Sequence, residues 1–361
     1  MLSLPQFNTQ DSPEFYKTLR KRVNQYFKEN NISKYGNTAM KIKTIAMVSL
    51  YFVPLILLYT GVFTNLWIIA GLWILMGMGM AGVGMSIMHD ANHGAYSKNK
   101  TVNKWLGKFL ALAGGSDVNW KIQHNVIHHS FTNVHDVDED IDTHGILRFS
   151  PNQPRKKIHR FQSIYAWFFY GLLTLNWSLI KDFFQLSDYN KKNLLKTQNT
   201  NFAKALTEII LTKAFYFTLT LVLPIILLPF AWWQTLLMFV LMHFVAGLIL
   251  SLIFQSAHVL QDTTFHLPKD NGSLENSWAI IQLKSTANFA PKSRILSWFI
   301  GGLNFQIEHH LFPNICHVHY KKISEIVKET AQEFQLPYYE YPTFAHALSN
   351  HFQFLHRLGK A

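Results

Sequence analysis

The sequence predicts an all-α membrane protein, with four transmembrane helices arranged as two hairpins and a cytosolic helical cap. Charged residues make up only 15% of the 361 residues, against roughly 25% in soluble domains. Four apolar runs are each long enough to cross ~30 Å of hydrocarbon. Lysine and arginine are absent between Lys43 and Lys98, and again between Lys213 and Lys269, and these stretches contain most of the apolar runs.

The apolar runs and the basic residues divide the chain into five segments of one integrated domain. Basic residues gather before, between and after the two pairs of runs, so the positive-inside rule places both termini and the central segment in the cytoplasm. The predicted segments are a cytosolic N-terminal segment (1–44), a first hairpin (45–88), a cytosolic segment with possible interfacial helices at 105–115 and 164–180 (89–208), a second hairpin (209–257) and a cytosolic cap with an amphipathic helix at 323–335 (258–361).

Composition also narrows the possible partners. The formal net charge is +12, but the basic residues do not form one compact module, so a nucleic-acid partner is not expected. A basic cytosolic surface suits anionic membrane lipids or an acidic protein partner. Cys316 is the single cysteine, which excludes a disulfide and a thiolate metal site.

Eight of the 18 histidines lie just beyond the predicted membrane spans. They are His89 and His93 in "HDANH", His124, His128 and His129 in "HNVIHH", His258, and His309 and His310 in "QIEHHLFP". Because an even number of spans separates the clusters, all eight are expected on the cytosolic side. The isolated histidines, such as His243, His346, His351 and His356, are interpreted as ordinary hydrogen-bonded or exposed side chains.

The spacing of the first two clusters is typical of helices that present paired imidazoles to a metal ion. Residues four apart share a helical face, with Cβ atoms about 5–6 Å apart. His129 would then point about 100° away from His128, towards a second ion. His258 has no partner at helical spacing. Neutral imidazole suits zinc, copper, iron and nickel, and eight histidines are enough for two ions.

The three motifs resemble the histidine boxes of the membrane fatty acid desaturase family in order, spacing and position relative to the spans. The resemblance runs from about residue 40 to the C-terminus. It implies that the cap carries a di-iron site of two non-haem irons with all eight histidines as ligands, O₂ as co-substrate and a lipid acyl chain as substrate. It also implies an integral multi-pass membrane protein with a cytoplasmic active site, in the inner membrane if the source is bacterial.

Gln306 occupies the place of the first histidine of the third box. The variant "QIEHH" resembles front-end desaturases, which insert a double bond between an existing one and the carboxyl end. We expect Gln306 to act in catalysis by tuning the ligand field of one iron. The alternative is that it only hydrogen-bonds a neighbouring ligand.

The electron donor is expected to be a separate protein. The sequence has no His-Pro-Gly-Gly haem motif, and residues 1–43 are too few for a fused cytochrome b5 domain. The chain therefore resembles the compact bacterial type, supplied by ferredoxin or by a cytochrome b5-like protein with its reductase.

Other residues near the boxes are candidates for supporting roles. Trp120 precedes His124 by four residues and is expected to line the acyl tunnel, or else to pack in the core. Asp90, Asp136 and Asp138 are candidates to orient ligand imidazoles, although the run "HDVDEDID" equally suits a solvated loop. His135, His317 and His319 are expected either to contact the metal ligands from outside or to lie at the protein surface.

Two rival functions remain at this point. A related di-iron hydroxylase or ketolase would use similar boxes, and the boxes do not separate these outcomes. A metal transporter would need ionisable groups inside its spans, and residues 45–88 contain no charged residue. The sequence therefore favours the desaturase.

Overall fold

Four long apolar helical segments dominate the chain. The computed structural model describes residues 4–361 and is largely helical. The segments long and apolar enough to cross a membrane are Thr38–Tyr59, Leu66–Asn92, Phe202–Leu227 and Trp232–His258. They contain most of each of the four apolar runs, so the prediction of four candidate transmembrane helices is confirmed. Their pairing and their direction across a membrane stay predictions.

The chain divides into two compact units, each built from separate stretches of sequence. The membrane unit comprises Thr38–Ile122 and Trp167–Leu252 and contains most of the four long segments; the cap unit comprises the chain up to Asn37, Gln123–Ala166 and Ile253–Ala361. Three elements contribute residues to both units: η3 (Lys121–His128), α7 (Gln162–Gly171) and α12 (Trp232–His258).

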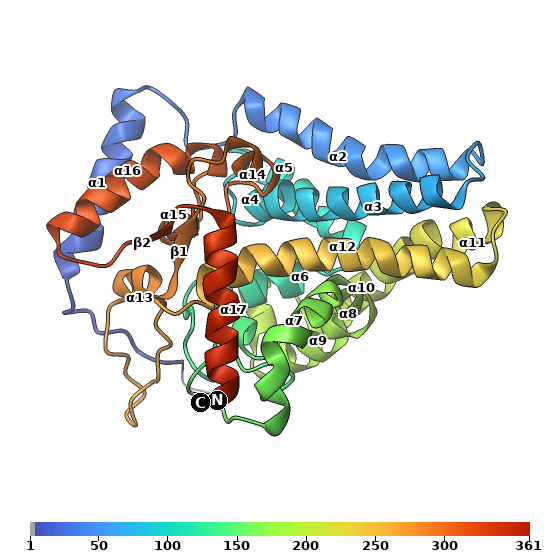
Figure 1. Cartoon of the computed structure of the whole chain (residues 1–361). Helices are drawn as coiled ribbons and strands as arrows, with labels where there is room; N and C mark the ends of the chain where they lie inside the picture. Colours follow the sequence, from blue (N-terminus) through green and yellow to red (C-terminus); the bar gives the residue numbers. More distant parts are fainter. Residues whose placement is uncertain (1–3) are drawn as a thin grey trace. The chain divides into compact units, whose positions relative to one another are not determined.

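The membrane unit contains α-helices, several of which are labelled in Figure 1, and shorter 3₁₀ and π turns. Its other elements are α2 (Thr38–Tyr59), α3 (Leu66–Val83), η1 (Gly84–Met88), α4 (His89–Asn92), α5 (Lys100–Gly107), η2 (Lys108–Ala113), α6 (Asp117–Trp120), α8 (Leu173–Asn176), η6 (Trp177–Lys181), α9 (Asp182–Lys191), η7 (Leu194–Gln198), α10 (Phe202–Phe217), η8 (Thr218–Val222) and α11 (Leu223–Leu227).

In the membrane unit, α2 and α3 lie side by side (Figure 1) because small residues let their backbones approach closely. A Cβ atom added to Gly79 would lie 2.6 Å from the backbone nitrogen of Tyr51. On the same helix, a Cβ at Gly77 would lie 2.5 Å from the backbone oxygen of Met242 in α12. Helix α3, which leads into the first histidine box, is thus fixed by glycine contacts on two sides.

The cap unit is also mainly helical. Its other elements are α1 (Pro13–Glu29), η4 (Glu139–Ile141), η5 (Lys157–Phe161), α13 (Trp278–Ser285), β1 (Ala287–Phe289), α14 (Arg294–Phe299), α15 (Gln306–Leu311), η9 (His317–His319), α16 (Tyr320–Glu333), β2 (Tyr339–Tyr341) and α17 (Phe344–Lys360). The helix expected at 323–335 is confirmed as part of α16.

The core of the cap unit lies against the third histidine box. Phe15 and Leu19 of α1 pack in one buried cluster with Ile323 and Val327 of α16, and this cluster includes Leu311, the last residue of α15. The hydroxyl of Tyr16 donates a hydrogen bond to the Leu311 oxygen at 3.1 Å. Apolar burial on one side of α15 therefore fixes the helix that carries His309 and His310.

One feature of the cap unit differs from the all-α prediction. Strands β1 and β2 form a two-stranded parallel sheet, with Ala287 opposite Tyr339 and Phe289 opposite Tyr341. Each strand has only three residues, which is too short to show the alternating pattern of a half-buried strand. The pairing joins residues about fifty positions apart, so local sequence gives no signal for it.

We predict that Gly79→Ala destabilises the membrane unit by about 1–3 kcal/mol, because the new methyl group forces α2 away from α3. Gly71 is the matched control, since it lies on the same helix and an added Cβ there meets no atom within 4 Å. Thermal unfolding of both variants in detergent measures the difference. Equal unfolding temperatures for the two variants would contradict the close packing.

Candidate metal centre

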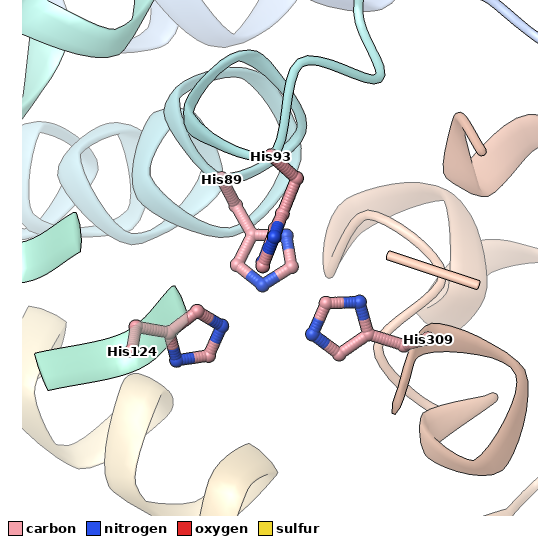
Figure 2. A group of neighbouring side chains, drawn as sticks. All are labelled: His89, His93, His124 and His309. Atoms are coloured by element: carbon pink, nitrogen blue, oxygen red, sulfur yellow. The ribbon is translucent and has the colours of Figure 1, made fainter. Parts of the chain in front are cut away.

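The first histidine box lies at the end of the long apolar segment Leu66–Asn92. His89 begins α4 and His93 is its C-cap, and the His93 amide donates to the His89 oxygen at 3.1 Å. Figure 2 shows both imidazoles projecting from this one turn, with ring centroids 4.7 Å apart. The predicted i,i+4 arrangement on one helical face is confirmed for this pair.

Trp120 packs against the same two imidazoles. Its ring centroid lies 5.7 Å from that of His89 and 5.8 Å from that of His93, both in edge-to-face contact. Trp120 is buried in a cluster with Met88 and Leu110. It therefore forms an apolar wall beside the first box, as a tunnel-lining residue would, while its contact with substrate stays a prediction.

The second box is a π-helix, not the expected α-helix. Element η3 covers Lys121–His128, and the His129 amide donates to the His124 oxygen at 3.0 Å, an i→i+5 bond. The wider turn brings His124 and His129 together, with Nε2 atoms 3.2 Å apart. The expectation of an α-helix for this box was therefore wrong. The extra residue per turn explains how three imidazoles of this box share one region.

The third box is a short helix entered through a glycine turn. Gly301 and Gly302 have φ of +65° and +67°, a left-handed backbone conformation that glycine adopts without steric cost. Helix α15 then begins at Gln306, and all six of its residues are buried. The turn and the helix together place His309 and His310 inside the cap unit.

A buried carboxyl group anchors this helix. Glu308 accepts hydrogen bonds from the Asn288 amide at 2.8 Å and the Tyr338 hydroxyl at 3.0 Å. Burial raises the pKa of Glu308 to about 7, although these two hydrogen bonds act in the opposite direction. The Asn288 side chain also accepts from the Ile307 amide at 3.0 Å, which links α15 to strand β1.

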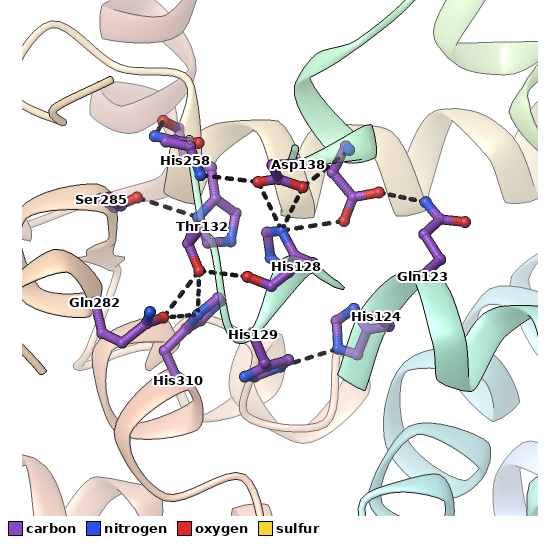
Figure 3. Close-up of polar contacts among 12 residues, drawn as sticks. Gln123, His124, His128, His129, Thr132, Asp138, His258, Gln282, Ser285 and His310 are labelled. Atoms are coloured by element: carbon purple, nitrogen blue, oxygen red, sulfur yellow. Dashed lines mark hydrogen bonds and ion pairs between the residues drawn. The ribbon is translucent and has the colours of Figure 1, made fainter. Parts of the chain in front are cut away.

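Three histidines from different parts of the sequence converge in the cap unit. His128, His258 and His310 each offer a ring nitrogen within 4.8 Å of the others, and all three are buried. Figure 3 shows the three side chains near one another. The structure therefore brings His258, which had no partner in the local sequence pattern, into a group with one histidine from each of the second and third boxes.

The Nδ1 atoms of these three imidazoles are held by oxygen atoms (Figure 3). His128 Nδ1 lies 3.0 Å from a carboxylate oxygen of Asp138, and His310 Nδ1 lies 2.8 Å from Gln282 Oε1. His258 Nδ1 lies 3.2 Å from the Ser285 main-chain oxygen. An imidazole that donates through Nδ1 keeps the lone pair of Nε2 for a metal. Hydrogen bonds of this kind orient metal-ligating histidines.

The atoms on the other side of this group fit a metal ion. Among residues 4–361, the Nε2 atoms of His128, His258 and His310 are buried and have no hydrogen-bond partner. The amide of Gln306 lies beside His258, yet neither its oxygen nor its nitrogen makes a hydrogen bond of standard geometry with any described residue. Unsatisfied buried polar atoms are costly, and a metal ion bound between these side chains would satisfy the three imidazole nitrogens and the Gln306 oxygen.

Two carboxylates control the charge around His128. Burial disfavours its protonated form, but the charges of Asp138 and Asp140 outweigh burial and raise the pKa of His128 to about 9. Asp138 is itself held by the main-chain amide of Asn133 at 2.8 Å. The same carboxylates would partly compensate the positive charge of a bound cation.

A second group of imidazoles in the cap unit involves His124, His129 and His309. His129 Nε2 lies 2.9 Å from His309 Nε2, and the His309 Nδ1 atom lies 3.2 Å from the Tyr320 hydroxyl. The rings of His124 and His309 are parallel within 15°, with centroids 5.8 Å apart (Figure 2). His129 also stacks on His310 at 4.3 Å, so it lies between the two groups of the cap unit.

The three predicted orienting carboxylates occupy different environments. Asp138 holds His128, as described above. The Asp90 carboxylate is buried 3.8 Å from His89 Nδ1, which is beyond hydrogen-bonding distance. The Asp136 side chain is 84% exposed and lies 3.4 Å from His135 Nε2, as in the solvated-loop alternative.

The structure adds contacts that the sequence pattern did not single out. They are Asp140, Gln282, Ser285 and Tyr320, together with Thr132, whose hydroxyl lies 2.9 Å from Gln282 Oε1. Of these residues, only Asp140 lies in the acidic run "HDVDEDID". Of the histidines left open, His319 contacts the Tyr35 main-chain oxygen at 3.2 Å, and His317 is buried beside Gly302.

These histidine clusters, at and beyond the ends of helical segments long and apolar enough to cross a membrane, are compatible with the metal centre of a membrane oxidoreductase. A family model described as fatty acid desaturase matches residues 65–342. That match covers well over half of the chain. The chain belongs to the fatty acid desaturase family.

Several related proteins match nearly the whole chain. The sn-1 linoleoyl-lipid 6-desaturase of Synechocystis sp. is 34% identical over 351 residues, which cover 96% of each protein. The enzyme of the same name from Arthrospira platensis is 33% identical and covers 96% of this chain and 92% of its own length. The acyl-lipid (8-3)-desaturase of Physcomitrium patens is 36% identical over 97% of this chain and 72% of its own length.

We predict that Asp138→Asn lowers metal affinity about 10–100-fold, the usual effect of removing a hydrogen-bonding partner of a ligand. Asp136→Asn is the matched control, because that carboxylate is exposed and two residues away in the same loop. Iron retained during dialysis against a graded series of chelator concentrations measures the affinity. Identical retention curves for the two variants would show that Asp138 does not support a ligand.

Proposed function

We propose that the protein is a front-end acyl-lipid desaturase that uses two non-haem irons, O₂ and two electrons to introduce a cis double bond into a lipid acyl chain. The observation that carries the proposal is the convergence of buried imidazoles in a chain of this family, with Nδ1 atoms anchored and Nε2 atoms left for metal. Front-end placement is supported by Gln306 in the third box and by relatives named as 6-desaturases.

The first iron would be held by His128, His258 and His310. Their three Nε2 atoms supply most of a coordination shell, and the Gln306 amide is available beside His258. An amide oxygen is a weaker ligand than imidazole, so this iron would keep an exchangeable position. Asp138 holds His128, and Gln282 holds His310, in the orientation that binding requires.

The second iron would be held by His89 and His93 together with His124 and His309. The proposal rests on the number of ligands. A pair of histidines on one helical turn supplies only two, and the cap unit has three further box histidines that are not in the first group, His124, His129 and His309. His129 would serve either ion, because it contacts His310 as well as His309.

The substrate would be the acyl chain of a membrane lipid. When bound, the irons would supply the O₂-dependent oxidation that removes two hydrogens from unactivated methylenes, a step that side-chain acids and bases cannot perform. The chain's own part is to hold a flexible acyl segment in place and to exclude water. Trp120 would form one wall of the channel, because it is apolar, buried and in contact with the first box.

Both termini and the metal centre would face the cytoplasm, in keeping with the distribution of lysine and arginine. A separate protein would deliver the two electrons, either ferredoxin or a cytochrome b5-like protein with its reductase. The basic surface of the chain supports this choice, since it would attract an acidic carrier, more weakly at high salt.

We predict that the purified protein with an added donor converts a polyunsaturated acyl lipid to a product two mass units lighter, and that His310→Ala abolishes conversion. His356→Ala, which changes an exposed histidine on α17, is the control and should leave conversion intact. Gas chromatography–mass spectrometry reads the product. A product sixteen mass units heavier would establish a hydroxylase instead, and full conversion with NADH and O₂ alone would contradict the separate donor.

We predict a specific role for Gln306 from two substitutions. Gln306→His should retain both irons but lower turnover or shift the position of the new double bond, because imidazole binds iron more strongly than an amide. Gln306→Ala should lower activity with little change in thermal unfolding. Wild-type rates and double-bond positions in both variants would mean that Gln306 has no part in the reaction.

A further inference from the structure

A buried ion pair in the membrane unit lies outside the metal centre. Lys213 belongs to the candidate span Phe202–Leu227, and its Nζ atom lies 2.9 Å from Asp182 Oδ2. The Lys213 side chain is 7% exposed and the Asp182 side chain is fully buried. An ionisable side chain in a membrane span is costly, and such residues are usually functional.

Lys213 connects three segments of the membrane unit. In addition to Asp182, its ammonium donates to the main-chain oxygens of Gly114, Trp177 and Ser178, each at 2.9 Å. Trp177 and Ser178 belong to the π-helical turn η6, and Gly114 ends the 3₁₀ turn η2 with a φ of +69°. The ammonium thus holds η6 and the turn after η2 against α10.

Asp182 fixes the residues that lead to Trp120. Its carboxylate accepts from the Ser116 amide at 3.1 Å, and its main-chain oxygen accepts from the Asn119 side chain at 2.8 Å. Ser116 is the N-cap of α6, the single turn that ends at Trp120. Asp182 therefore contacts the residue that begins this turn and the residue next to Trp120.

The same carboxylate also orients a second aromatic residue. Its Oδ1 atom accepts from the Trp177 indole at 3.0 Å, and Trp177 packs against the cluster that contains Trp120. Trp120 in turn contacts the imidazoles of His89 and His93. A continuous set of contacts therefore runs from the buried ion pair to the first histidine box, entirely within the membrane unit.

We infer that the Asp182–Lys213 ion pair is a positioning device: it holds Trp120 against the first histidine box and so fixes which carbons of the acyl chain face the irons. This inference rests on the proposed desaturase function. Removing the pair would let Trp120 shift, and misplacement of about 1 Å can lower turnover on the order of 10²-fold. The position of the new double bond would become less uniform as well.

A double-mutant cycle tests the inference. Asp182→Asn and Trp120→Phe should each lower turnover and yield products with double bonds at neighbouring positions, and the combined variant should be no worse than Trp120→Phe alone. Asp188→Asn is the matched control, because it breaks the more exposed Asp188–Lys192 pair of the same helix region. Additive losses in the cycle, with an unchanged product position in Asp182→Asn, would overturn the inference.

A second readout does not depend on activity. In protein labelled with 5-fluorotryptophan, Trp120→Phe identifies the ¹⁹F resonance of Trp120 by its loss. This resonance should shift or broaden in Asp182→Asn and stay unchanged in Asp188→Asn. An unchanged Trp120 resonance in Asp182→Asn would overturn the inference.

Unpaired buried charges are destabilising, so Asp182→Asn could fail to fold. In that case the double variant Asp182→Asn with Lys213→Gln, which leaves no unpaired charge, replaces Asp182→Asn. The same results are expected in the double-mutant cycle and in the ¹⁹F measurement.

The proposed function and the positioning role fail in different ways. A wild-type protein that makes no desaturated product contradicts the proposed function, whereas normal wild-type product with additive losses contradicts only the positioning role.

Discussion

Burial of imidazole rings is the constraint on which the site depends. A polar atom without a partner in a protein interior is costly, and this chain buries at least three imidazoles in one group within its cap unit. The Nδ1 atoms of His128, His258 and His310 are satisfied by protein oxygens, but their Nε2 atoms are not satisfied by any residue in 4–361. A metal ion bound between these nitrogens would satisfy them, since neutral imidazole is a common ligand of first-row transition metals.

Irregular backbone places the histidines where regular helices would not. The first box follows the π-helical turn η1, and the second box is itself the π-helix η3. Such turns insert a residue into a helix and are common at functional sites. Gly301 and Gly302 bring the third box into position through a left-handed turn. The regular helices provide the framework, and these local departures orient the histidines.

Much of this organisation could be predicted from the sequence, for physical reasons. Four long apolar runs, in two pairs flanked by basic stretches, indicate membrane spans, because hydrocarbon excludes charge. Paired histidines four residues apart indicate a helical face, and His89 and His93 follow that rule. The oxygen atoms that contact the imidazole Nδ1 atoms were harder to predict from the sequence. Asp138 was a candidate only because it is near the second box, whereas Gln282 and Ser285 lie far from any box in sequence and meet the histidines only through tertiary folding.

The errors have equally local causes. An α-helical period was assumed for "HNVIHH", and a π-helix cannot be distinguished from an α-helix by residue type, so the helix type of the second box was wrong. The pairing of β1 with β2 involves strands too short to have a pattern. His258 is the opposite case. Its sequence context gave little support, and the structure groups it with His128 and His310.

The number and kind of metal ions in the protein test most directly whether the histidine clusters bind two irons. Metal analysis of wild-type protein, purified without chelators and reconstituted anaerobically with ferrous iron, provides the test. Two irons per chain are expected, because the histidines of the three boxes and His258 together exceed what one ion can bind. A fully loaded sample that contains one zinc ion and no iron would contradict the account.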